Sequence, residues 1–201
     1  MLYLVDPSQV EIDKQKGSRF IAFAFPLQEQ AHVLTHIEQI KMNHPKAQHF
    51  CYAWRLLDGS EGFSDDGEPH GSAGVPILKP LVGRHVINIL VVVVRHFGGV
   101  KLGVGGLVRA YGQACQNLLS CAMLAPYIPH TQFVFSYPYD QEGSVRSVFS
   151  KFSGLSLEFS YEDTVSVRVQ LPSSELNDML KSLNEALGGQ LSWEIHSDKS
   201  E

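Results

Sequence analysis

The chain has 201 residues, 44% of them hydrophobic and 18% charged, which is typical of folded globular proteins and excludes disordered and collagen-like classes. No stretch approaches the roughly 20 apolar residues of a membrane helix, and the first residues lack a secretory signal, so we expect a cytoplasmic protein without a membrane partner. The net charge of -5 argues against a general nucleic-acid binder. The chain has three cysteines, Cys51, Cys115 and Cys121, and no C-x-x-C motif. This pattern favours reduced thiols, either buried or on a helix face, over disulfides or a zinc site.

The first elements are a strand and a helix. Residues 18–27 mix aromatic and branched side chains without a helical stripe, which predicts a strand that ends at Pro26. Residues 28–44 predict an amphipathic helix that ends before Pro45. Its expected buried face holds Ala31, Leu34, Ile37 and either Ile40 or Met42.

A second strand is predicted for residues 49–57, and the acidic, glycine-rich segment 58–74 predicts a long loop. The apolar run 86–97 is typical of a strand covered on both faces. After a glycine-rich turn, the apolar spacing predicts a buried helix that contains Leu107, Val108, Tyr111, Ala114, Cys115, Leu118 and Leu119. The two prolines of residues 125–131 predict a short linker.

The pattern restarts after this linker. Alternating and helical spacings predict, in order, a strand, a helix, two strands, a helix with a serine N-cap and a last strand, at 131–139, 140–154, 155–172 (both strands), 173–189 and 190–196. This βαββαβ order is that of the ferredoxin-like fold. We therefore expect an α+β protein of two domains, residues 1–130 and 131–201.

Charge is distributed unevenly along the chain. Residues 1–130 hold 11 Lys and Arg against 10 Asp and Glu, whereas residues 131–201 hold 5 against 11. No acidic residue occurs between Glu68 and Asp140. That acid-free span carries five cations, Lys79, Arg84, Arg95, Lys101 and Arg109.

The stretch "RHFGGVKLGVGGLVRAYGQA", residues 95–114, is the first candidate site. It contains neither a Walker A motif nor a complete G-x-G-x-x-G, because Val108 stands at the last position. Glycines at a helix N-terminus with nearby cations are typical of an anion-binding site. The same residues are also explained by a plain strand-to-helix turn, in which His96 has only a structural role. Phosphoryl transfer needs a metal-holding carboxylate, which the span lacks. The candidate phosphate or nucleic-acid contacts are Arg95, His96, Gly98, Gly99, Lys101, Gly103, Gly105, Gly106 and Arg109.

The acidic loop is the second candidate. Its residues Asp65, Asp66, Glu68 and His70 form an acidic rim or partner contact in our interpretation, with helix capping and a divalent metal site as alternatives. A Ser72–His70–Asp66 hydrolase triad is disfavoured, because no G-x-S-x-G elbow is present. Trp54 and Phe63 are candidates for base stacking, with burial in the core favoured for Trp54.

Four segments together resemble one known family. "KGSRFIAFAF", "HFCYAWRL", "FSDDGEPHGSAGVPIL" and "NILVVVVRHFGGVKLGVGGLVRAYG" are similar to the IMPACT family and cover most of residues 14–112. The resemblance implies an N-terminal left-handed βαβ superfold, shared with elongation factor G domain IV and the GHMP kinases. It also implies a ferredoxin-like C-terminal domain similar to one of elongation factor G.

The family resemblance also implies a link to translation. Eukaryotic members bind an activator of a translation-initiation-factor kinase and restrain the starvation stress response, together with an N-terminal RWD domain that has no counterpart here. We therefore expect a non-enzymatic protein, without metal or cofactor, that binds RNA, the ribosome or a translation factor. Two alternatives remain open. One is an enzyme acting on a phosphorylated small molecule or nucleotide through Asp66, Glu68 and His70, and the other is a protein-interaction scaffold.

Overall fold

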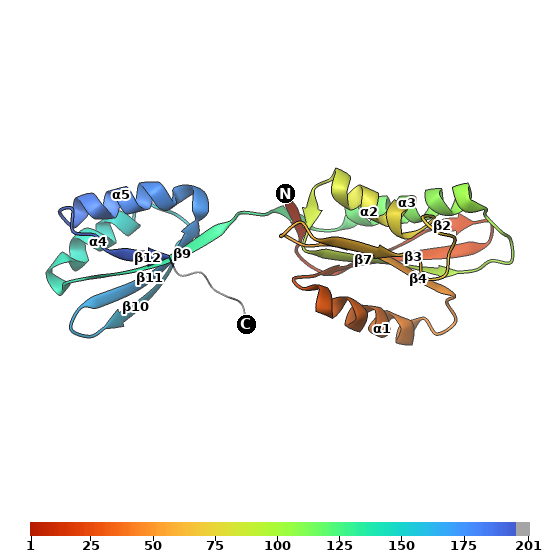
Figure 1. The fold of residues 1–201 in the computed structure, drawn as a ribbon, viewed down its shortest axis with the longest axis horizontal. Helices are drawn as coiled ribbons and strands as arrows, with labels where there is room; N and C mark the ends of the chain where they lie inside the picture. The colour runs from red at the N-terminus through yellow and green to blue at the C-terminus, as the bar shows by residue number, and fades with distance from the viewer. Residues whose placement is uncertain (196–201) are drawn as a thin grey trace. The chain divides into compact units, whose positions relative to one another are not determined.

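A computed structural model describes residues 1–195 and has an α+β architecture (Figure 1). The chain divides into two compact units, Met1–Tyr127 and a second that begins at Ile128. The division lies at 127/128, close to the expected boundary at 130/131. Within the described residues, no helix has the length and apolar character needed to cross a bilayer.

The first unit is built on a five-stranded antiparallel sheet. Its strand order is β2-β3-β7-β4-β5, with bounds Ser8–Gln15, Ser18–Pro26, Ile89–His96, His49–Arg55 and Glu61–Ser64. One face is covered by α1 (Val33–Asn43), which follows a short 3-10 turn, η1 (Gln30–His32). The other face is covered by α2 (Gly74–Gly83) and α3 (Val104–Cys121), as Figure 1 shows.

Strand β7 is the centre of this unit because both of its faces are buried. Ile89, Val91 and Val93 pack against α2 and α3, whereas Leu90, Val92 and Val94 pack on the side of α1. This two-sided burial explains why the segment is apolar throughout rather than alternating.

Three short strands form a separate sheet in the first unit. β1 (Leu2–Leu4) lies between β6 (Val86–Ile87) and β8 (Leu124–Pro126). Residues 124–126 are therefore part of the first unit, so the prediction that the linker begins at 125 was wrong. The prediction of an uninterrupted loop over 58–74 was also wrong, because β5 pairs with β4 inside it.

The buried face of α1 agrees with the expected one at Ile37 and Ile40 and differs from it at the other positions. Val33, Ile37 and Ile40 are buried, while Leu34 and Met42 are 64% and 74% exposed. Both sets fit a helical period, and the packing of α1 against the sheet selects the one that begins at Val33. Val108 of α3, predicted to be buried, is exposed as well.

The second unit has the βαββαβ order that the sequence indicated. Its elements are β9 (His130–Tyr137), α4 (Glu142–Phe149), β10 (Ser156–Tyr161), β11 (Val165–Pro172), α5 (Leu176–Ala186) and β12 (Trp193–Ile195). Short 3-10 turns, η2 (Tyr139–Gln141) and η3 (Ser173–Glu175), precede the helices, and the sheet order is β10-β11-β9-β12.

One detail of the second unit corrects the sequence analysis, and another lies beyond the described residues. No serine side chain caps α5, since Ser173 instead shares a hydrogen bond of 2.6 Å with the hydroxyl of Thr131. His196, predicted to end the last strand, lies outside the residues that the structure describes.

Candidate functional site

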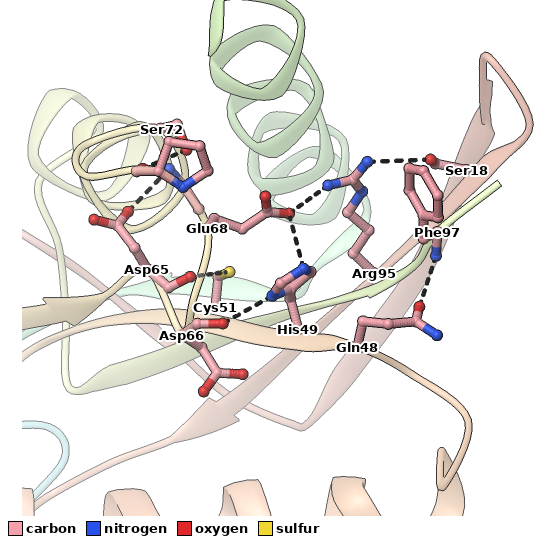
Figure 2. Close-up of polar contacts among 12 residues, drawn as sticks. Ser18, Gln48, His49, Cys51, Asp65, Asp66, Glu68, Ser72, Arg95 and Phe97 are labelled. Carbon is pink, nitrogen blue, oxygen red and sulfur yellow. Dashed lines mark hydrogen bonds and ion pairs between the residues drawn. The ribbon is translucent and has the colours of Figure 1, made fainter. Parts of the chain in front are cut away.

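The acidic loop and the glycine-rich turn meet at one end of β4 and β7. These strands are antiparallel neighbours, and their register places His49 opposite Arg95. The loop after β5 leads into α2, and the turn after β7 leads into α3. Figure 2 shows Asp65, Asp66 and Glu68 of this loop beside His49 and Arg95. The two candidate sites therefore meet at Glu68 and Arg95.

The centre of the site is the carboxylate of Glu68. Its Oε1 accepts a hydrogen bond of 2.7 Å from Arg95 Nη1 and one of 2.8 Å from the Tyr111 hydroxyl, while His49 Nε2 lies 3.9 Å away. The side chains of Glu68 and Arg95 are only 4% and 6% exposed. Burial of this pair is tolerable because each charge offsets the other and hydrogen bonds hold the carboxylate.

A layer of buried groups lies beneath the carboxylate. The Cys51 thiol contacts the Tyr111 hydroxyl at 3.3 Å and donates to the carbonyl of Asp65 at 3.0 Å. Burial raises the pKa of the Tyr111 phenol and of the Cys51 thiol well above their ordinary values. Both groups stay neutral at physiological pH and act as hydrogen-bonding groups that orient the site.

Asp65 and Asp66 have structural partners. The carboxylate of Asp65 accepts backbone N–H groups of Gly71, Ala73 and Gly74, at 2.8 to 3.0 Å, at the start of α2. Burial raises the pKa of Asp65, but these three donors together outweigh it and leave the pKa below its usual value. The Asp66 carboxylate accepts the N–H of Phe50, a residue of β4, at 2.6 Å. Asp65 therefore supports the capping interpretation, whereas Asp66 ties the loop to β4.

Two other loop residues differ in exposure. Ser72 is buried and donates to the carbonyl of Pro69 at 2.6 Å. The His70 side chain is 98% exposed and lies 3.7 Å from Asp65. Among residues 1–195, no group of three or more His, Cys, Asp or Glu side chains has a geometry that could hold a metal ion.

Arg95 is not a free surface cation. Besides Glu68, it donates to the Ser18 hydroxyl at 3.4 Å, and its guanidinium lies 5.6 Å from the Phe20 ring centroid and 5.4 Å from that of Phe97. Its Nε is buried without a hydrogen-bond partner in the described part of the chain. Arg95 therefore forms the buried base, or floor, of the site together with Glu68, and its charge is largely shielded from solvent.

Above this floor lies a pocket of about 550 Å³. It is lined by polar and aromatic side chains and by the N-terminus of α3, namely Gln48, His49, Glu68, Arg95, Phe97, Lys101, Gly103 and Val104 among others. The helix begins after Gly103, whose φ of 74° is the left-handed region that glycine adopts most easily. The positive end of α3 therefore faces the same space as Lys101.

The remaining predicted contacts lie outside the pocket lining. His96 packs against the His44 ring, at a centroid distance of 5.7 Å, and its pKa is lowered by burial and by His44. Gly98 and Gly99 are exposed at the turn, and Gly105, Gly106 and Arg109 lie on the first turns of α3. Trp54 is buried in the core and Phe63 is exposed.

A second groove, of about 570 Å³, lies between α2 and α3. Lys79, Arg84, Val108 and Gln116 are among its lining residues. Arg84 donates to the carbonyl of Leu119 at 2.7 Å, which ties the end of α2 to the end of α3.

Sequence reasoning missed Gln48 and His49 altogether and treated Tyr111 and Cys51 as core residues only. The signal for His49 is its strand register opposite Arg95, which requires knowledge of which strands pair. Gln48 is fixed by its Oε1, which accepts the Phe97 N–H at 2.8 Å.

Comparison with known proteins places these features in context. The model of the Impact N-terminal domain matches residues 16–119, and that of a domain of unknown function, DUF1949, matches residues 135–190. The IMPACT family member YigZ of Escherichia coli (strain K12) is 34% identical over 184 residues, 90% of each chain.

Solved structures are similar as well. A crystal structure described as that of a hypothetical protein is 31% identical, covers 98% of both chains and has a TM-score of 0.69. A second solved structure, described as that of the two-domain translational regulator Yih1, is 29% identical and covers 59% of this chain and 46% of its own, with a TM-score of only 0.34.

Proposed function

Because the chain belongs to the IMPACT family, we propose that it is a non-enzymatic cytoplasmic protein that acts in translation by binding RNA, as a free strand or in the ribosome. Translation is the process that the family resemblance implies. The proposed surface is the outer side of α2 and α3, together with the turn that precedes α3.

The observation that carries this proposal is the absence of acidic residues from that layer. No Asp or Glu occurs between Glu68 and Asp140, so α2, α3 and the connections around them carry cations alone. Lys79, Arg84, Lys101 and Arg109 are all exposed there. A one-signed surface attracts the phosphate backbone even though the whole chain has a net charge of -5.

The groove between α2 and α3 gives this surface a shape. Lys79 and Arg84 lie along it, and Arg84 is already held in place by the carbonyl of Leu119. Because phosphate contacts fix a strand without reading its bases, we expect binding with little sequence preference. Arg95, whose charge is paired with Glu68, shapes the adjoining pocket rather than contacting the strand backbone.

The same family membership supports a proposal about the two folds. We propose the left-handed βαβ superfold for the first unit and the ferredoxin-like fold for the second. The βαββαβ element order and the sheet order β10-β11-β9-β12 support the latter. Neither fold specifies a function by itself.

Co-sedimentation with purified ribosomes and with total RNA, across a series of salt concentrations, tests the proposed function. We expect binding at low salt that declines steeply as salt rises, and loss of most binding in Lys79→Ala/Arg109→Ala. The matched control is Lys46→Ala/Lys181→Ala, which removes two exposed cations outside the α2–α3 layer. Absence of binding at low salt, or equal loss in both variants, contradicts the proposal.

A further inference from the structure

The Glu68 carboxylate has one oxygen that the fold does not use. Its Oε1 takes the hydrogen bonds from Arg95 and Tyr111, and is also the atom nearest His49. The recorded hydrogen bonds of Glu68 among residues 1–195 use Oε1 alone, and Oε2 is not among the unpartnered side-chain atoms there that are sealed from solvent. Figure 2 likewise draws no interaction between Oε2 and the residues that it shows. A side chain that is 96% buried thus presents a fixed, unpartnered acceptor in a residue that lines the pocket.

Other residues that line the same pocket favour an anion. Lys101 and the N-terminus of α3 line it, and the N–H groups of the first helical turn have no partners within the helix. The charge of Glu68 does not cancel this attraction, because Arg95 lies 2.7 Å from it and makes the pair neutral.

The pocket also has an apolar wall. Phe97 is exposed and, with Leu102 and Val104, lines the cavity beside Lys101. An exposed aromatic face is a platform on which a nucleobase stacks. The volume of about 550 Å³ lies within the range of pockets that enclose small organic ligands.

From these three features we propose that the pocket binds a single ribonucleotide unit. The phosphate lies at Lys101 and the α3 N-terminus, a ribose hydroxyl donates to Glu68 Oε2, and the base stacks on Phe97. His49 and Arg95 are positioning residues that hold Glu68. The 2′-hydroxyl is the group that distinguishes RNA from DNA, so the pocket would select ribose over deoxyribose, which a phosphate-binding surface alone does not.

This inference rests on the proposed function where the ribonucleotide belongs to an RNA strand, but the chemistry is the same for a free mononucleotide. Two arms of the experiment separate these sources. In the first, calorimetry measures binding of adenosine 5′-monophosphate and of its 2′-deoxy counterpart. In the second, fluorescence anisotropy compares a short single-stranded RNA with the DNA of the same sequence.

We expect the ribose form to bind about tenfold or more tightly than the deoxy form in at least one arm, because a charged acceptor is otherwise left unpaired. Selectivity in the first arm identifies a mononucleotide site, and selectivity in the second arm alone identifies an RNA strand. A ratio near one in both arms, or no binding in either, overturns the inference.

Two variants assign the selectivity to the pocket. Glu68→Gln keeps an oxygen for Arg95 and Tyr111 but replaces the free oxygen by an amide donor, so the ratio should fall below about threefold. Lys101→Ala should weaken both forms about equally and leave the ratio unchanged, because it removes a phosphate contact. Thermal melting tests whether each variant is folded. If Glu68→Gln does not fold, the ratio of ribose to deoxyribose affinity in the wild type and in Lys101→Ala decides whether the pocket selects ribose.

Failure of this inference is distinguishable from failure of the proposed function. If RNA binding is salt-sensitive and depends on Lys79 and Arg109 but is equal for RNA and DNA, the proposed function holds and the ribonucleotide pocket is rejected. Ribose selectivity that persists in Glu68→Gln would also exclude Glu68 as the acceptor.

Discussion

Glu68 and Arg95, 27 residues apart in the chain, form a 2.7 Å ion pair in which both side chains are almost completely buried. The pair joins the acidic loop to the strand that precedes the glycine-rich turn. Because both charged groups are shielded from water, each is stable in the folded protein only while it is paired with the other.

Replacing one member of this pair should therefore be costly. We expect Arg95→Met to lower the free energy of unfolding by about 3–5 kcal/mol, since it leaves a buried carboxylate without its cation. Urea unfolding measures the loss. The double variant Arg95→Met/Glu68→Gln should recover part of it, and a double variant as unstable as the sum of the two single variants would contradict the coupling.

Asp65 makes a separate, pH-dependent contribution through the start of α2. Its pKa is lower in the folded chain than in the unfolded one, so its stabilisation is complete above the unfolded pKa and is lost as pH falls through the folded pKa. We expect Asp65→Asn to cost about 1–2 kcal/mol at neutral pH.

Unfolding of the wild type and of Asp65→Asn at a series of pH values tests this origin of the effect. The difference should stay constant from pH 7 down to about pH 4, the ordinary range of an aspartate pKa, and then shrink at lower pH. A difference that does not change with acidification would show that the carboxylate charge contributes nothing.

The glycine-rich turn contains one position where a side chain has no room. A Cβ at Gly98 would lie 1.9 Å from the carbonyl carbon of Gly17 and 2.2 Å from the nitrogen of Ser18. We expect Gly98→Ala to destabilise the fold by about 3 kcal/mol or more, because backbone rather than a flexible side chain must move.

Gly105→Ala, in the first turn of α3, is the matched control. A Cβ there meets nothing within 4 Å, and alanine favours a helix, so stability should be unchanged or raised by up to about 1 kcal/mol. Thermal unfolding of the two variants compares them directly. Equal losses at both positions would mean that the two turns around Gly17 and Gly98 do not pack as described.

The three cysteines should differ in reactivity. Cys51 and Cys115 are buried, and burial raises the pKa of Cys115 to about 12, whereas Cys121 is exposed. Titration of the native protein with a thiol-specific disulfide reagent should modify Cys121 quickly and the other two only on unfolding. Rapid modification of Cys51 would show that the layer beneath Glu68 is open to solvent.

The sequence was most informative where elements are long and periodic. The strand of residues 89–96, the helix of 104–121 and the βαββαβ order all follow from apolar spacing. The strands Leu2–Leu4 and Ser8–Gln15 were missed, and Leu124–Pro126 was taken for linker. The two three-residue strands carry no measurable period and form only through tertiary pairing. The face of α1 was predicted correctly at Ile37 and Ile40, whereas Leu34 was expected in place of Val33 because both residues fit a helical period.

For the candidate site, the residue types were predictable but their contacts were not. Glycines and cations around Lys101 indicated an anion site without any knowledge of the fold. The pairing of Arg95 with Glu68 and the position of His49 depend on the register between β4 and β7, which local sequence does not encode.

The most direct test of the account is the salt dependence of RNA binding. The measurement is the affinity for a single-stranded RNA across a salt series, in the wild type and in Lys79→Ala/Arg109→Ala. Each lost phosphate contact should reduce the slope of log affinity against log salt by roughly 0.7, so the account predicts a decrease of about 1.4 for two contacts. An unchanged slope, or flat salt dependence in the wild type, would contradict the claim that this helical layer binds RNA.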